Sequence, residues 1–239
     1  WIGVDALKLY EVFLYIKKMK NYQEFLETKK KTFIESGFEI KESKLNKNLF
    51  DFQKHAVKTA LRKGKFALFF DCGLGKTLMQ LSWSEAVFKH TKKKVLILAP
   101  LAVVEQTKDE AVKFGISLDC FDITNYDQLK NIENINQYAG VVLDESSILK
   151  GRDGKLSSLI ISAFKNTPYK LACTATPSPN DHMELGQHSE FLGAMAYLEM
   201  LAMFFVHDGG ETSKWRLRKH AKDTSVSYTH LTLPTNREV

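Results

Sequence analysis

Short, continuously apolar runs alternate with longer mixed stretches between residues 65 and 176. A loop rich in Gly, Pro, Thr or Asp follows each run, as is typical of a buried strand that ends at a turn. The pattern predicts strands at Phe66–Phe70, Val95–Ala99, Val141–Leu143 and Lys170–Cys173, and helices near Thr77–Lys89, Ala102–Phe114 and Lys155–Phe164. Apolar strands that alternate with helices indicate an α/β fold with a parallel sheet sandwiched between helices. Ligands bind such sheets at the carboxyl ends of the strands.

One further apolar stretch, from Leu192 to Val206, differs from these runs in length. It is shorter than the roughly 20 residues that cross a bilayer, and Glu199 lies within it, so no membrane partner is expected. We expect a helix that is buried or faces a partner. Because the part from Ala194 onward is rich in methionine and aromatic residues, a core or an interface with a further lobe is favoured over a cofactor site.

Composition and charge restrict the class of protein only broadly. The 239 residues are 44% hydrophobic and 26% charged, which excludes a disordered, collagen-like or disulfide-rich chain. The formal charge of +6 favours an acidic partner such as nucleic acid, although only weakly at this length. We predict that the lysine runs Lys29–Lys31 and Lys92–Lys94 are solvated. The three cysteines form no C-x-x-C pair, which indicates reduced thiols and a cytoplasmic location.

The two ends of the sequence differ from the rest. The chain opens at Trp1 without a methionine, and a polar helical pattern begins at Met19, so residues 1–18 are interpreted as a segment that need not be native. Residues 226–239 resemble the translated adaptor read-through that ends many environmental sequence fragments. The alternative for this tail is a genuine edge strand, because several of its residues have fair β propensity.

The strongest motif is the run Asp71–Thr77 (DCGLGKT), which directly follows a predicted strand and opens a predicted helix. Gly73 and Gly75 let backbone N–H groups approach a phosphate chain without clashes from Cβ atoms. The start of the helix adds its positive end at the same place. The run therefore predicts a phosphate-binding loop.

Two side chains of this loop carry the expected chemistry. Lys76 supplies a charge to the β and γ phosphates, and the hydroxyl of Thr77 can ligate Mg²⁺. The full phosphate-loop pattern has a glycine where Phe70 stands, which is its one departure. A chance Gly-Lys-Thr in an ordinary loop is the alternative, and the strand before it and the helix after it argue against that alternative.

A second motif, Asp144–Ser147 (DESS), follows the strand predicted at Val141–Leu143. Acidic pairs on surface loops are common and usually carry no function. Here the carboxylates emerge at the sheet edge where the phosphate loop also lies. Mg²⁺ prefers one or two carboxylates together with waters and phosphate oxygens, which suits Asp144. Glu145 would then orient and polarise an attacking water, a task that phosphoryl transfer leaves to the protein.

The third motif is the run Cys173–Asn180 (CTATPSPN), again after a predicted strand. The hydroxyls of Thr174 and Thr176 could connect the acidic loop to another surface. A turn rich in Pro, Ser and Asn would have the same composition and is the alternative.

Weaker features follow this motif. The run Lys214–His220 has the basic and aromatic composition that binds phosphates and stacks on bases, although a solvated helix face is the preferred interpretation. We interpret as surface or turn residues, without defensible ligand spacing, His182, His188, His207 and Asp208.

Taken in order, the motifs resemble those of superfamily-2 helicases. The resemblance covers roughly residues 39–206, and its last stretch is similar to Swi/Snf-type and DEAD/DEAH-box-like translocases, including versions common in phage and prophage genomes. Six motifs in order are far more specific than any one of them. They are Phe52-Gln53, Asp71–Thr77, Leu98–Pro100, Ile123–Tyr126, Asp144–Ser147, and Thr174–Asn180 followed by Glu184-Leu185.

The resemblance implies a RecA-like lobe that uses ATP and Mg²⁺ and acts on nucleic acid, DNA rather than RNA. It implies that Gln53 contacts the adenine edge and that loops near Pro100 and Thr124 contact the nucleic-acid backbone. The phosphates would be held by Gly73, Leu74, Gly75, Lys76 and Thr77.

The same resemblance assigns the catalytic roles. Asp144 and Thr77 would bind the metal, and Glu145 would position the attacking water. Thr174 and Thr176 would couple hydrolysis to motion between lobes.

Two departures limit the transfer. Ser147 stands where family members have a His or Asp that couples to the other lobe. Family members also carry a second lobe that supplies arginine fingers, and the sequence after Thr176 is shorter than such a lobe and lacks its Q-x-x-G-R-x-x-R pattern. We expect a helical extension at 1–48, the lobe at 49–206, the start of a truncated inter-lobe region at 207–225 and a non-native tail at 226–239.

The preferred interpretation is therefore the first lobe of an ATP-dependent helicase or translocase that lacks its second lobe. As a fragment, it is expected to hydrolyse ATP hardly at all. One alternative is a P-loop ATPase or kinase that does not act on nucleic acid, which explains neither Gln53 nor the third motif. The other alternative is a P-loop module that binds nucleotide without turnover.

Overall fold

The computed structural model describes residues 35–150, 154–177, 182–207 and 215–217. The chain divides into two units, residues 1–33 and residues 34–239, and everything below concerns the second. The predictions for residues 1–18, for Lys29–Lys31 and for the tail at 226–239 lie outside the described residues. Within the described part of the predicted extension, only Glu42–Lys44 is helical, as one 3₁₀ turn, so residues 35–48 are not the helix that was predicted.

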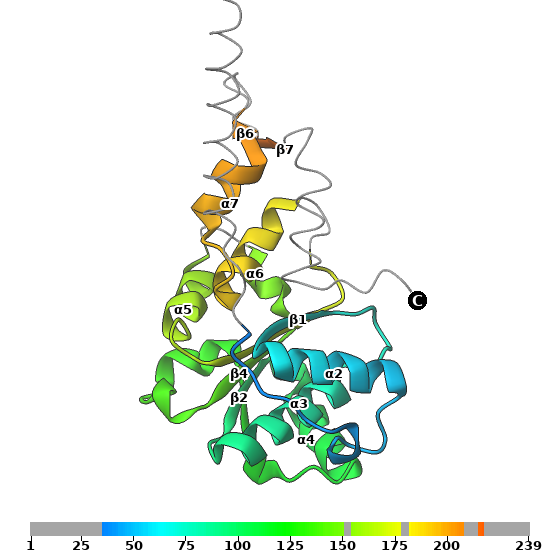
Figure 1. Ribbon diagram of the computed structural model, residues 1–239. Coiled ribbons are helices and arrows are strands. Elements are labelled where there is room, and N and C mark those ends of the chain that lie inside the picture. Colours follow the sequence, from blue (N-terminus) through cyan, green and yellow to red (C-terminus); the bar gives the residue numbers. More distant parts are fainter. Residues whose placement is uncertain (1–34, 151–153, 178–181, 208–214, 218–239) are drawn as a thin grey trace, which may run out of the picture. The chain divides into compact units, whose positions relative to one another are not determined.

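A parallel sheet of five strands forms the centre of the described unit (Figure 1). Its strands are β1 (Lys65–Phe69), β2 (Val95–Ala99), β3 (Phe121–Asn125), β4 (Gly140–Asp144) and β5 (Tyr169–Thr174). Their order across the sheet is β1-β5-β4-β2-β3, and every neighbouring pair is parallel. The predicted α/β fold is confirmed, and the four predicted strands end within one residue of the observed ones. Strand β3 was not predicted.

Helices cover both faces of this sheet. They are α2 (Asp51–Lys63), α3 (Lys76–Thr91), α4 (Val104–Lys113), α5 (Lys155–Ala163) and α6 (Leu185–Leu192). Side chains alternate between the faces along each strand, so that Leu68 belongs to one core cluster while its neighbours Ala67 and Phe69 belong to another. Buried residues of α2, α3 and α4 complete the first cluster, and those of α5 and α6 complete the second.

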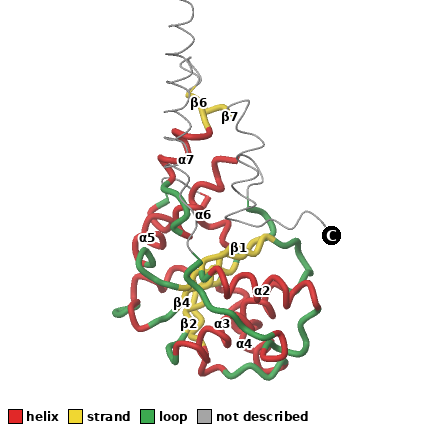
Figure 2. The backbone as a smooth tube through the Cα atoms, viewed as in Figure 1, coloured by secondary structure: helices red, strands yellow, loops and turns green. Residues whose placement is uncertain are grey.

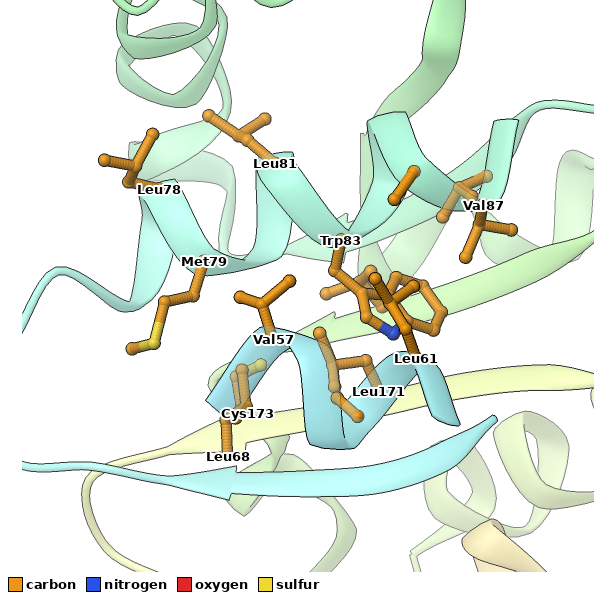
Figure 3. Close-up of a cluster of buried hydrophobic side chains, with 14 of the residues drawn as sticks. Val57, Leu61, Leu68, Leu78, Met79, Leu81, Trp83, Val87, Leu171 and Cys173 are labelled. Carbon is orange, nitrogen blue, oxygen red and sulfur yellow. The ribbon is translucent and has the colours of Figure 1, made fainter. Parts of the chain in front are cut away.

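The first cluster explains why α3 is buried nearly all round. Figure 3 shows Met79 and Trp83 of α3 above Val57 and Leu61 of α2, with Leu171 of β5 beneath them. All five side chains are fully buried. This packing fixes the direction of the helix that follows the predicted phosphate loop, and it thereby places the first turn of that helix at the carboxyl edge of the sheet.

The apolar stretch from Leu192 to Val206 is not the single helix that was predicted (Figure 2). Helix α6 ends at Leu192 because Gly193 adopts a left-handed conformation with φ of 71°. Helix α7 (Tyr197–Phe204) follows, and strand β6 (Phe205–His207) then pairs antiparallel with β7 (Trp215–Leu217). The predicted burial of this stretch is confirmed by a third apolar cluster that includes Met200 and Phe204 of α7.

Strand β7 overturns a second helix prediction. The run Lys214–His220 was interpreted as a helix face, and its described residues 215–217 instead form a strand. The lysines Lys92, Lys93 and Lys94 are exposed, as predicted. No helix among the described residues is long and apolar enough to cross a membrane.

Candidate active site

The loop between β1 and α3 has the backbone that a phosphate-binding loop requires. Gly73 and Gly75 have φ values of 80° and 72°, in the left-handed region that favours glycine. A Cβ atom added at Gly73 would meet nothing within 4 Å, so the loop is open there. Helix α3 begins at Lys76 and directs its free N–H groups at the loop. The predicted phosphate-loop residues therefore lie together, and the space at Gly73 suits a phosphate chain.

The side chain of Lys76 binds its own loop. Its Nζ donates to the backbone carbonyls of Phe70 and Asp71 at 2.9 and 3.0 Å. An ammonium group has three donors, so one is left for a further acceptor. Thr77 occupies the second position of the helix and is half-buried.

Gln53 connects helix α2 to the same loop. Its Nε2 donates to the carbonyl of Leu74 at 2.9 Å, and its Oε1 accepts from the N–H of Phe50 at 2.9 Å. The side chain is buried, and a Cβ atom at Gly75 would lie only 2.5 Å from Nε2. Glycine at position 75 is therefore required both by its backbone conformation and by the closeness of Gln53.

Phe70 stands where the full pattern has a glycine, and the structure explains this departure. The Phe70 ring is buried in the first core cluster, with its centroid 6.2 Å from that of Phe52. Phe52 in turn stacks on Phe50, which is 69% exposed. The partly exposed rings of Phe50 and Phe52 thus lie at the start of the helix that carries Gln53.

Asp144 ends strand β4 and is tied to the phosphate-loop helix. Its Oδ1 accepts a hydrogen bond of 2.7 Å from Nε2 of Gln80, one turn beyond Lys76 on α3. Burial raises the pKa of the Asp144 carboxyl, the hydrogen bond from Gln80 opposes that rise, and the charge of Glu145 adds to it. Oε1 of Gln80 is buried and has no hydrogen-bond partner.

Glu145 has an uncommon backbone conformation and a well-defined carboxylate. Its φ is 60°, in the left-handed region that few non-glycine residues adopt. Its Oε1 accepts hydrogen bonds from Thr174 Oγ1 at 2.6 Å and from Ser147 Oγ at 2.5 Å. Ser147, the departure from the helicase motif, therefore contacts Glu145 within this lobe.

The third motif meets the second through Thr174, which is fully buried at the end of β5. Thr176 lies one step further out: its N–H donates to Thr174 Oγ1 at 3.1 Å, and its own hydroxyl accepts from Lys150 Nζ at 3.3 Å. In the sheet register Thr174 lies beside Phe69, and Asp144 lies beside Cys173. The ends of β1, β5 and β4 therefore bring the three motifs to one edge.

The donor set fits a magnesium ion better than a transition metal. No group of three or more His, Cys, Asp or Glu side chains that could hold a metal occurs in the described ranges. One carboxylate and one hydroxyl, Asp144 and Thr77, suit a hard cation that takes its other ligands from water and phosphate oxygens. All three cysteines are free, and Cys120 and Cys173 are buried.

Sequence reasoning gave three residues of this region no role at the site. Gln80 could have been found, since it lies four positions after Lys76 and so on the same face of α3. Tyr126 is nearly fully buried and donates its hydroxyl to the backbone carbonyl of Asp144 at 2.6 Å. The prediction that His188 is a surface or turn residue is wrong, because its side chain is 0% exposed on α6 and contacts Ser146. Nothing in the local sequence indicates that contact.

A cavity of about 360 Å³ opens at the ends of β2, β3 and β4. Its lining includes Pro100, Asn125, Tyr126, Glu145 and Ile148. The loops after β2 and β3 thus line the same cavity as Glu145.

Comparisons with known proteins agree with the α/β fold described above. The family described as type III restriction enzyme, res subunit, matches residues 46–158, which include the Asp71–Thr77 and Asp144–Ser147 motifs. The SWI2/SNF2 ATPase core of Sulfolobus solfataricus in complex with dsDNA superposes with a TM-score of 0.62 and 19% identity, over 84% of this chain and 45% of that one. The fold is that of the RecA-like lobes of such ATPase structures.

Two further structures resemble the helicase-like lobe. The UvsW helicase from bacteriophage T4 superposes with a TM-score of 0.50 and 21% identity, over 71% of this chain and 64% of that chain. The Hef helicase domain of Pyrococcus furiosus superposes with a TM-score of 0.50 and 18% identity, over 59% of this chain and 36% of that chain. The helicase-like lobe therefore spans less than two thirds of the length of these proteins. No curated protein matches it.

Proposed function

We propose that the lobe, at residues 49–206, binds and hydrolyses ATP with Mg²⁺ as the first ATP-binding lobe of a nucleic-acid helicase or translocase. The observation that carries the proposal is the 2.7 Å hydrogen bond between Gln80 and Asp144. It joins the helix of the phosphate loop to the strand that ends in the acidic pair. A nucleotide whose phosphates lie over Gly73 would thus have Asp144 within reach of its metal.

Binding uses groups that are now occupied within the protein. Lys76 exchanges its bonds to two backbone carbonyls for bonds to the β and γ phosphates, while Gln53 exchanges its bond to Leu74 for the adenine edge. The partly exposed rings of Phe50 and Phe52, at the start of the helix that carries Gln53, offer an apolar surface to the base.

The chemistry belongs to Glu145. A bound Mg²⁺ would neutralise charge on the phosphates, held through Asp144 and the hydroxyl of Thr77. Glu145 orients the attacking water and accepts its proton, while Thr174 and Ser147 hold the carboxylate in place. Thr176 continues from Thr174 toward Lys150, and this chain of bonds is the route by which hydrolysis would be coupled to motion.

The nucleic-acid partner is proposed from the cavity and the charge. The loops near Pro100 and Thr124 border the cavity that Glu145 also lines, so a strand bound there would contact the catalytic loop. The formal charge of +6 favours a polyanion. We propose DNA, since the similar SWI2/SNF2 core was determined with dsDNA.

A second RecA-like lobe would supply a guanidinium on the far side of the γ-phosphate. An arginine finger contributes about 10³–10⁵ in turnover. With enzyme turnover commonly between about 1 and 10³ per second, the chain alone should complete about one event per minute or fewer.

Steady-state phosphate release tests this proposal, with Glu145→Gln as the blank. We expect a slow, Glu145-dependent rate that added DNA does not raise, because a strand stimulates by closing two lobes. A Glu145-dependent rate above about one per second, raised further by DNA, would mean that no second lobe is needed or that self-association supplies it. A rate that Glu145→Gln leaves unchanged contradicts the assignment of the catalytic carboxylate.

A further inference from the structure

Behind the acidic pair lies a buried contact that the proposed chemistry does not use. Ser146 directly follows Glu145, and its Oγ lies 3.0 Å from Nε2 of His188. Both side chains are 0% exposed. Because 42 positions separate them in the sequence, the contact joins the acidic loop to helix α6 rather than to its own neighbours.

The surroundings determine how this contact is made. Nδ1 of His188 lies 3.4 Å from the backbone carbonyl of Glu184, which can only accept. Nδ1 therefore carries the imidazole proton, and the lone pair of Nε2 accepts the hydrogen bond from the Ser146 hydroxyl. Burial lowers the pKa of His188 to about 4, although the hydrogen bond with the Glu184 backbone opposes that shift, so the ring is neutral at pH 7.

The imidazole also contacts the strand that leads into the phosphate loop. Its ring meets that of Phe69 edge-on, with centroids 5.4 Å apart and an interplanar angle of 89°. Phe69 is the last residue of β1. His188 thus contacts the two segments that carry the phosphate loop and the acidic pair, from a helix that belongs to neither.

Glu145 needs such support because its backbone is unfavourable on its own. A non-glycine residue at positive φ persists only where its surroundings fix it. Tyr126 fixes the carbonyl of the preceding residue, Asp144, and the contact with His188 fixes the following residue, Ser146. The contact with His188 therefore ties the peptide after Glu145 to helix α6.

We propose that His188 and Ser146 are positioning residues for the hydrolysis proposed above, holding Glu145 so that its carboxylate stays on Thr174 and the attacking water. The inference rests on that proposed function. It predicts that loss of the contact slows cleavage of bound ATP and leaves ATP binding nearly unchanged, because neither side chain lies on the phosphate loop.

Single-turnover cleavage of labelled ATP by excess full chain tests the inference, with Glu145→Gln as the blank. We expect Ser146→Ala and His188→Leu each to slow cleavage by about 10- to 100-fold, the range typical when a residue that orients a catalytic ligand is removed. His188→Gln, whose amide oxygen can still accept from Ser146, should lose less. The double variant should be no slower than the slower single one, since both changes remove one interaction.

Two matched variants control for general effects. Ser84→Ala removes a buried hydroxyl that bonds only within α3, and His90→Leu removes an exposed imidazole that stacks on Phe38. Both should cleave ATP at the wild-type rate. Thermal unfolding of every variant confirms that it is folded at the assay temperature.

Titration with a fluorescent ATP analogue separates failure of the inference from failure of the proposed function. If Lys76→Ala binds the analogue as tightly as wild type, the proposed function fails, and the inference fails with it. If binding depends on Lys76 but Ser146→Ala and His188→Leu cleave as wild type, or lose affinity and cleavage equally, the inference alone is overturned.

Discussion

Gln80 and Asp144 form a 2.7 Å hydrogen bond between the phosphate-loop helix and the end of β4. Burial raises the pKa of the Asp144 carboxyl, and the hydrogen bond from Gln80 opposes that rise. The bond therefore opposes protonation of Asp144 and fixes its carboxylate against helix α3, which suits a metal ligand.

Replacing Gln80 by Leu should weaken the contribution of Mg²⁺ to nucleotide binding. Loss of a partner that orients a metal ligand typically lowers metal affinity by about 10- to 100-fold. The measurement is the affinity for a fluorescent ATP analogue with and without Mg²⁺. Gln106→Leu, which removes an exposed amide bonded to Glu110 on α4, is the matched control. An unchanged Mg²⁺ dependence in Gln80→Leu would show that Asp144 needs no orientation by α3.

Tyr126→Phe should destabilise the fold because it removes the hydroxyl that donates a hydrogen bond to the Asp144 carbonyl. A buried hydrogen bond contributes about 1 kcal/mol, which corresponds to about 2–4 °C in a domain of this size. Thermal unfolding measures the shift. Tyr138→Phe removes a hydroxyl bonded to Asp122 at a more exposed position and should change the midpoint less. Equal shifts of the thermal midpoint in the two variants would contradict the importance assigned to the hydrogen bond between Tyr126 and the Asp144 carbonyl.

The elements that a local sequence pattern determines were predicted, and those that depend on their place in the fold were not. Val95–Ala99 was predicted to the residue because a continuous apolar run is fully buried in the middle of a parallel sheet. Strand β3 was missed because it is an edge strand: only Phe121 is buried, and the following residues DITN read as a loop. The apolar stretch after Leu192 was predicted as one helix because composition alone does not show that Gly193 ends the first helix.

The residues of the candidate site also differ in whether the local sequence could predict them. Gly73, Lys76, Asp144 and Thr174 could be predicted, since they lie in local motifs after apolar strands. The contact of His188 with Ser146 could not, because a lone histidine in a polar stretch carries no local indication of a partner in another element. Gln53 was predicted, but its bond to Leu74 depends on how α2 packs against the loop.

Stability should fall with acid through His188. Its pKa is about 4 in the folded chain and 6.5 ordinarily, so the unfolded chain binds more protons between these values. The stabilisation is complete above pH 6.5 and is lost as the pH falls toward 4. Between pH 7 and pH 5 the expected loss is about 2 kcal/mol.

Urea unfolding at the two pH values checks this expectation against His188→Gln, which cannot titrate. The variant should lose about 2 kcal/mol less than wild type over the same interval. Identical losses would show that the imidazole is not held neutral in the folded chain.

Binding of ATP through Lys76 is the central claim, and titration with a fluorescent ATP analogue tests it most directly. Lys76→Ala removes the ammonium group of the phosphate loop, and loss of such a charge-assisted contact costs about 1.5–3 kcal/mol, or roughly 10- to 150-fold in affinity. Lys89→Ala, which removes an exposed ammonium on the same helix, is the control and should bind as wild type. Equal affinities for wild type and Lys76→Ala would contradict the assignment of the phosphate loop and the function built on it.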